Sequence, residues 1–402
     1  MAPFLNLISP KRIEMRIQRF VFQLSLFLAP CAISPSHALR ASPPASAPGI
    51  AQAATLQADA ETIIIDVRLL ISRAAEQARS GEFGRAATGI QSAIADYQQR
   101  YSPDCWVVKY CGAFLAEIRQ IERETDKARE ARAEFWRALN GVSFAPGKSS
   151  ETPEFIRLYA AVRELGSSAG TDTPTYYMGL VLLGRLADAR CDFTAAASLF
   201  ERGQNVCIHC FGTDGPDYAD SLHLLADAKF KLGQYRESIE LYKKLLPARE
   251  RCCGRLSINY TYALVGLARA EFMERKYAAA EASARSAVST YESLGVSERI
   301  GPVTRSSLAM TLFAQGKSEE ADVEYAKAEE TGARCGLTAS ELANIYEAHA
   351  DSFAKRGRMQ EAAKMHGQAA KLRVSTAPMQ SNPLPMPANR NNYPTTDENR
   401  TR

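Results

Sequence analysis

The sequence lacks the residue combinations that catalysis commonly uses. Only five of its 402 residues are histidines, and no His-Glu pair has the spacing of a zinc-dependent protease. No glycine-rich loop precedes a phosphate-binding lysine, and no serine lies in a nucleophile elbow. We therefore predict a protein without catalytic residues, a metal site or a cofactor.

The sequence also has little excess charge. Its formal net charge is +4. Three of these four positive charges come from the first 38 residues, which hold four basic side chains against one acid: Lys11, Arg12, Arg16, Arg19 and Glu14. Because the rest of the chain is nearly neutral, neither nucleic acid nor a membrane surface is a predicted partner.

The first 38 residues have the pattern of a secretory signal peptide. Residues 15–19 are basic, residues 20–29 are apolar but too short to span a bilayer, and residues 36–38 offer small side chains for cleavage. The pattern predicts an exported protein, periplasmic or secreted, with no membrane attachment after cleavage. A retained membrane anchor and a lipoprotein modified at Cys31 are the alternatives.

One pattern recurs between residues 174 and 374 with a step of 41 or 42 residues. One column is aromatic in three units and then continues with two other residues: Phe193, Tyr235, Tyr277, Ser318 and Met359. Three residues later comes a column of small side chains: Ala196, Ser238, Ala280, Ala321 and Ala362. A fixed period with size-specific columns predicts stacked, similar units rather than one closed core.

Each unit is predicted to contain two helices. In residues 218–246, Leu222 and Leu225 fall on one helical face, Gly233 interrupts the pattern, and Tyr235 begins a second apolar face. The small column lets the two helices approach closely, because short side chains face large ones. The predicted fold is all-α, a solenoid of antiparallel helix pairs.

These columns resemble the tetratricopeptide repeat family over about half of the chain. Besides the two columns above, the resemblance rests on pairs of leucine and a small residue: Leu183-Gly184, Leu225-Ala226, Leu267-Ala268 and Leu308-Ala309. It also rests on aromatic residues further along the second helices: Phe200, Tyr242 and Tyr325. The period exceeds the usual ~34 residues and is similar to repeats of the kinesin light chain type. The last unit departs most, with His349 and His366 at usually apolar places.

The resemblance implies a right-handed superhelix whose first helices line its concave face. The partner-binding residues expected on that face are Arg185, Asp227, Phe230, Arg269, Phe272, Met310 and Phe313. Aromatic anchors flanked by charges suit an extended peptide. We therefore expect a non-catalytic protein-protein interaction scaffold that binds a peptide or protein. The alternative is that the phenylalanines only pack between repeats.

Eight cysteines follow the predicted signal peptide, and the repeat pattern requires none of them. An even number in an exported protein favours disulfides. Cys210 and Cys252 occupy equivalent places in successive units, so we predict a disulfide from Cys252 to Cys210, or to Cys207 in its place. Free thiols are one alternative. An exported thiol-redox or metal-binding protein that uses Cys207, Cys210, Cys252 and Cys253 is the other.

The sequence thus divides into a signal peptide (1–38), a flexible linker (39–60), degenerate N-terminal helical hairpins (61–166), the repeat solenoid (174–374) and a disordered tail rich in Pro and Asn (375–402). The hairpins are out of phase with the solenoid, and a helix near residues 155–165 is predicted to be an insertion. The tail lacks the apolar residues needed to offset its chain entropy.

Overall fold

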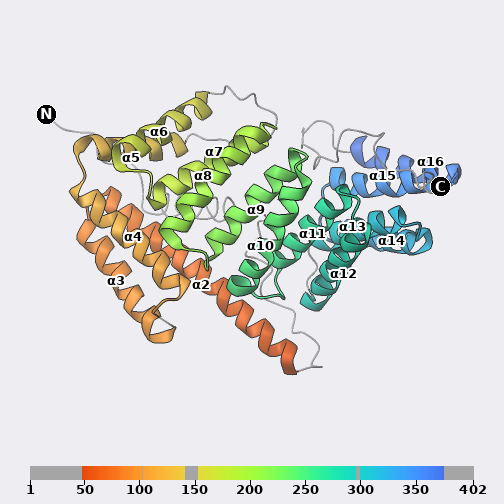
Figure 1. The fold of residues 1–402 in the computed structure, drawn as a ribbon, viewed down its shortest axis with the longest axis horizontal. Helices are drawn as coiled ribbons and strands as arrows, with labels where there is room; N and C mark the ends of the chain where they lie inside the picture. Colours follow the sequence, from red (N-terminus) through yellow and green to blue (C-terminus); the bar gives the residue numbers. More distant parts are fainter. Residues whose placement is uncertain (1–47, 102, 141–152, 296–298, 375–402) are drawn as a thin grey trace.

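The computed structural model describes residues 48–101, 103–140, 153–295 and 299–374 (Figure 1). In these ranges all regular structure is helical and no strand occurs. The helices of the N-terminal part are α2 (Pro48–Arg79), α3 (Phe83–Arg100), α4 (Trp106–Arg123), α5 (Asp126–Asn140) and α6 (Pro153–Ala169). The helices of the repeats are α7 (Pro174–Ala189), α8 (Phe193–Phe211), α9 (Pro216–Lys231), α10 (Tyr235–Cys253), α11 (Ile258–Met273), α12 (Tyr277–Leu294), α13 (Ile300–Ala314), α14 (Ser318–Arg334), α15 (Ala339–Lys355) and α16 (Met359–Val374).

The repeats form five helix pairs that follow one another from α7/α8 to α15/α16 (Figure 1). Every second helix begins at a residue of the first predicted column, from Phe193 to Met359. The turn before it needs a residue with positive φ, which glycine adopts without strain. Gly233 meets this need with φ of 76°, whereas Cys191 and Arg275 adopt φ of 63° and 59° in the equivalent turns. The prediction of an all-α solenoid of helix pairs is confirmed.

Short side chains set the distance between paired helices, as predicted. The small column is buried in every unit, and the Ser238 hydroxyl donates a hydrogen bond of 2.9 Å to the Ala226 carbonyl. Two glycines lie where no side chain fits. A Cβ at Gly184 would be 2.5 Å from the Phe200 ring, and one at Gly266 would be 2.3 Å from the Tyr242 ring. Close helix contact therefore depends on these positions.

One predicted boundary in the N-terminal part differs from the structure. Residues 48–60, expected to belong to a flexible linker, are the beginning of α2. They contain five alanines, which have the highest helix propensity, and Pro48 stands at the helix start, where its missing N–H costs nothing. From there α2 runs obliquely past the lower ends of α8 and α10 (Figure 1) and packs against α3, α4 and α10. The signal peptide, residues 39–47 and the tail lie outside the described residues.

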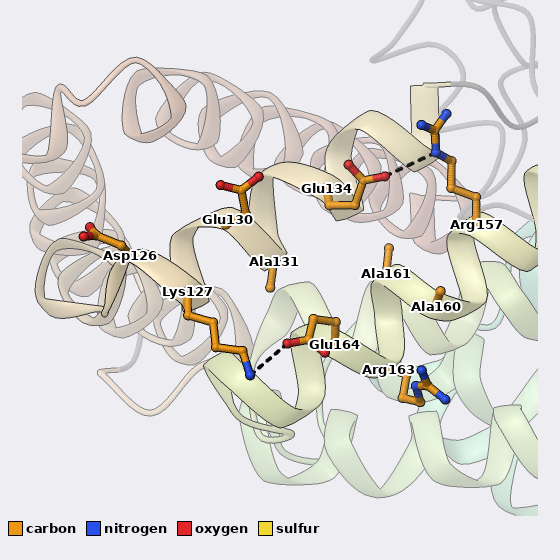
Figure 2. Close-up of a pocket in the computed structure, with 10 residues that line it drawn as sticks. All are labelled: Asp126, Lys127, Glu130, Ala131, Glu134, Arg157, Ala160, Ala161, Arg163 and Glu164. Carbon is orange, nitrogen blue, oxygen red and sulfur yellow. Dashed lines mark ion pairs between the residues drawn. The ribbon is translucent and has the colours of Figure 1, made fainter.

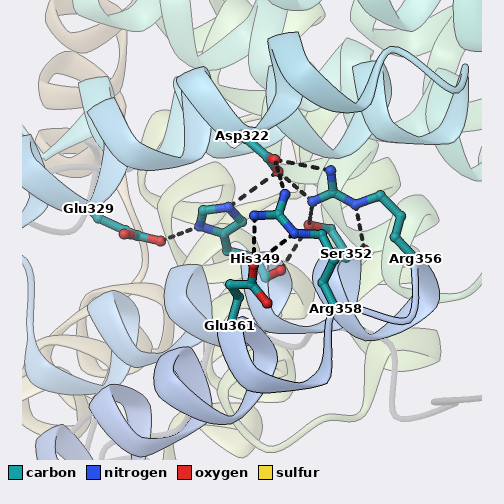
Figure 3. Close-up of polar contacts among 7 residues, drawn as sticks. All are labelled: Asp322, Glu329, His349, Ser352, Arg356, Arg358 and Glu361. Atoms are coloured by element: carbon teal, nitrogen blue, oxygen red, sulfur yellow. Dashed lines mark hydrogen bonds and ion pairs between the residues drawn. The ribbon is translucent and has the colours of Figure 1, made fainter.

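A polar cluster on α14–α16 lies beside the apolar contacts of the last junction (Figure 3). His349 is buried, with Nδ1 2.6 Å from Glu329 Oε1 and Nε2 3.4 Å from Asp322 Oδ1. Its ring stacks between those of Tyr325 and Phe353, at centroid distances of 4.7 and 4.3 Å. The unusual histidine therefore joins neighbouring helix pairs through polar contacts and ring stacking. His366, by contrast, is exposed on α16.

Candidate partner-binding face

The seven residues predicted to bind a partner lie on first helices. We call this set the first-helix face; it consists of Arg185 on α7, Asp227 and Phe230 on α9, Arg269 and Phe272 on α11, and Met310 and Phe313 on α13. All seven are half-buried. The structure brings two of the units together here, because the Arg269 guanidinium lies 4.8 Å from the centre of the Phe230 ring.

The phenylalanines of this face also pack within their own units. Phe230 contacts Tyr235 and Phe272 contacts Tyr277, with ring centroids 5.4 and 5.6 Å apart. Each ring therefore helps to close the turn between a first and a second helix. One part of each remains accessible, so packing and partner contact are compatible at these positions.

The two arginines of the face have no ion pair among the described residues. Burial lowers the pKa of the Arg185 guanidinium, and the surrounding acids, among them Asp220, Asp188 and Asp227, only partly oppose this. Its Nε atom is buried without a hydrogen-bond partner in the part of the chain that the structure describes. Arg269 contacts the Phe230 ring but no carboxylate of that part. Both guanidinium groups thus lie on the face without a direct ion pair in the described part of the chain, although acids surround Arg185.

Asp227 lies between these arginines in the repeat order, with polar partners of its own. The Tyr242 hydroxyl donates a short hydrogen bond to its carboxylate, and His223 Nε2 is 3.5 Å from Asp227 Oδ2. Burial lowers the pKa of His223, so its imidazole is neutral near pH 7. The first-helix face therefore carries two arginines, and the hydrogen-bonded carboxylate of Asp227 lies between them in the repeat order.

A buried charge cluster where α2 meets α9 and α10 was not foreseen as a unit. Asp220 Oδ2 is 3.5 Å from Arg68 Nη2, and its Oδ1 accepts a hydrogen bond of 2.7 Å from Arg249. Burial raises the pKa of the neighbouring Asp217 to about 6, against the attraction of Arg68. No local pattern in the sequence pairs Asp220 with an arginine 152 positions earlier.

The cysteine predictions are not confirmed, and the predicted crosslink is absent. None of the eight cysteines in the described ranges forms a disulfide. Cys207 lies in the core cluster of the N-terminal units, whereas the Cys252 sulfur is 3.2 Å from that of Cys253, in the next cluster. Equivalent places in stacked units are separated by about one interhelix spacing of 8–10 Å, which exceeds disulfide reach. No metal-binding group of three or more ligands occurs among the described residues.

The chain matches one protein-family model, the tetratricopeptide repeat, over residues 175–251 and 217–293. Residues 175–293 are therefore tetratricopeptide repeats. A comparison with curated proteins finds no match. Among the helices that the structure describes, none is long and apolar enough to cross a membrane.

Several solved structures are similar in fold. BtubC (BKLC) from P. vanneervenii is 16% identical, with 64% of this chain and 93% of that one covered and a TM-score of 0.45. The putative kinesin light chain repeats of Podosopora anserina are 19% identical, with 50% and 97% covered and a TM-score of 0.42. A Rap protein solved with Competence and Sporulation Factor is 10% identical, with 78% and 98% covered and a TM-score of 0.42. Likenesses of this extent say nothing about partners.

Proposed function

We propose that this chain of tetratricopeptide repeats is a non-catalytic scaffold that binds a segment of another protein along the first-helix face. One observation carries the proposal: Arg185 and Arg269 are held on that face without a carboxylate partner in the described chain. A partly buried guanidinium without a direct ion pair is costly, and an acidic partner group would reduce that cost. The half-buried Phe272 and Met310 add apolar contact area beside the charges.

The proposal is tested by affinity capture with three forms of residues 39–402. The wild type is compared with Arg185→Gln/Arg269→Gln, which removes both charges from the face. The matched control is Arg236→Gln/Arg285→Gln on second helices, whose arginines form exposed ion pairs with Glu274 and Glu281. We expect the same proteins to be retained by wild type and control and lost from the first variant. Equal capture by all three forms would refute the proposal.

The alternative function, thiol-redox or metal chemistry, has weak support. Burial raises the pKa of Cys210 to about 12 and that of Cys207 well above its ordinary value. The hydrogen bond with Cys253, together with burial, raises the pKa of Cys252. Thiols rather than thiolates are then present near pH 7, and thiols are poor nucleophiles and poor metal ligands. Reduction of insulin by the wild type, lost in Cys207→Ser, would favour this alternative over the scaffold.

We also propose that the protein is exported, on the strength of the pattern in residues 1–38. N-terminal sequencing of the mature protein is expected to begin at Leu39. Recovery of a chain that retains residues 15–38 from the soluble cytoplasm would contradict export.

A further inference from the structure

Helix α6 borders two hollows that differ in chemistry. The first, of about 680 Å³, lies between α5 and α6 (Figure 2). Lys127 Nζ is 3.2 Å from Glu164 Oε1, so these two charges are paired across it. Arg157 Nε is likewise 3.2 Å from Glu134 Oε1. Its apolar lining consists of three alanines: Ala131, Ala160 and Ala161. This hollow is large, but it offers a ligand little apolar surface and few free charges.

The second hollow, of about 280 Å³, lies between α6, α7 and α8. Its floor is apolar and consists of the buried side chains Val162, Leu180, Leu183 and Leu199. Its wall includes Tyr159, which is 48% exposed, and the two exposed arginines Arg163 and Arg202. An apolar floor with a few polar groups at the rim is the usual composition of a small-molecule site.

Neither arginine at this rim is neutralised by a described carboxylate. Arg163 makes no ion pair in the ranges the structure covers, and Figure 2 shows no contact between it and the four carboxylates around the first hollow. The neighbouring Glu164 is engaged by Lys127 and by the Ser168 hydroxyl, which donates a hydrogen bond of 2.8 Å. The rim therefore has an excess of positive charge.

Arg202 is fixed in place without being neutralised. Its Nη2 donates a hydrogen bond of 2.7 Å to the hydroxyl of Tyr176 and not to a carboxylate. The Tyr176 ring in turn packs against Gly166, where an added Cβ would be 2.7 Å from the ring. The glycine, the tyrosine and the arginine thus form one wall, and the wall leaves the remaining N–H donors of Arg202 for another acceptor.

We propose that this hollow binds a small organic acid, with its apolar chain or ring against the leucine floor and its carboxylate between Arg163 and Arg202. Guanidinium groups bind carboxylates through paired, charge-assisted hydrogen bonds. Burial of the apolar body is favourable, and the free energy gained increases with the apolar area removed from water. A volume near the lower end of the range for ligand sites limits the ligand to roughly a dozen non-hydrogen atoms.

Calorimetric titration of the full chain with three probes tests the proposal. The probes are 4-phenylbutyrate, 4-phenylbutanol and 4-phenylbutylamine, which share an apolar body and differ in the charge of the head group. We expect the carboxylate to bind at least ~10-fold more tightly than the amine, because only the carboxylate pairs with both arginines. Its affinity should fall several-fold at high salt, since the rim charges are exposed to solvent.

Two charge variants decide whether the arginines are responsible. Arg163→Gln/Arg202→Gln should weaken 4-phenylbutyrate binding by about 10-fold or more. Arg157→Gln/Arg137→Gln removes the same charge beside the first hollow and should leave the affinity unchanged. Both variants replace exposed side chains, and circular dichroism verifies their folding. Equal binding of the three probes, no binding of 4-phenylbutyrate below about 10 mM, or full binding by the first variant would overturn the proposal.

Discussion

The two halves of the molecule bury their apolar side chains in different ways. From α2 to α9 the buried side chains form one continuous cluster that extends from Val67 to Ala228. Beyond it, the described residues form four smaller clusters, several of them lined by alanine. The N-terminal part and the first repeats thus share one large core, whereas the later repeats have a divided one. A clear period indicates contact between nearest neighbours, and it does not require a large common core.

The junction between α14 and α15 shows how polar contacts supplement apolar packing in the later repeats. These helices pack less extensively than α8 and α9 do. The polar cluster lies at this place, and Asp322 on α14 also forms ion pairs with Arg356 and Arg358 at 2.6 and 3.3 Å (Figure 3). Partly exposed ion pairs contribute less than buried apolar contacts. We therefore expect α15 and α16 to unfold locally before the helices of the continuous cluster do.

The largest effect is expected from Phe135→Ala in the continuous core. Phe135 is fully buried on α5 and reaches α7, where a Cβ at Gly179 would be 3.3 Å from its ring. Its removal should lower the free energy of unfolding by about 3–5 kcal/mol. Hydrogen exchange measured by mass spectrometry should then accelerate throughout α3–α8. Acceleration confined to α5 and α6 would show that the N-terminal cluster does not behave as one unit.

The sequence predicted the repeats, α7 to α16, well and the N-terminal part, α2 to α6, poorly, for a physical reason. The column from Phe193 to Met359 marks the start of every second helix, because a repeat encodes contacts between neighbours a fixed distance apart in the chain. The contact of Arg68 with Asp220 follows no period, and neither does the docking of α2 on α10. The pairing of Cys210 with Cys252 was wrong because equivalent residues do not touch merely by occupying equivalent places.

The sequence predicted which residues share the first-helix face, but it did not predict all of their contacts. Arg185, Asp227 and Arg269 follow one another at 42-residue steps, so one face was predictable. The unpaired state of Arg185 Nε depends on how α7 is covered, which no local pattern shows. The second hollow depends on the packing of Gly166 on α6 against Tyr176 on α7, which no local pattern indicates.

The substitution Asp217→Asn tests how the buried charges between α2 and the repeats affect stability. Because the folded pKa of Asp217, about 6, exceeds its ordinary value of 3.8, the folded state binds its proton more tightly than the unfolded state does. Stability from this group is therefore present at low pH and lost as the pH rises through 6. Asparagine should raise the free energy of unfolding by roughly 1–3 kcal/mol at pH 7. In urea titrations the gain should shrink between pH 6 and pH 4, and a gain independent of pH would contradict this.

His349→Ala should have the smallest effect and a local one. It removes the stacked ring and leaves Glu329 and Asp322 without their common partner, at a cost of about 1 kcal/mol. Hydrogen exchange should accelerate in α15 and α16 and remain unchanged in α9 and α10. The exposed Arg285→Gln serves as the control, because such surface ion pairs contribute about 0.5 kcal/mol or less. Acceleration in α9 after His349→Ala would mean that the last repeats are coupled to the earlier ones more strongly than their separate cores indicate.

Site-specific photo-crosslinking tests the central claim, that a partner binds the first-helix face, most directly. A benzophenone side chain replaces Met310 on that face in one form of the protein and Val323 in another. Val323 lies on second helix α14 and is 52% exposed, so it controls for accessibility. In the presence of a partner retained by affinity capture, we expect a covalent adduct from position 310 and none from position 323. An adduct from position 323 without one from position 310 would contradict it.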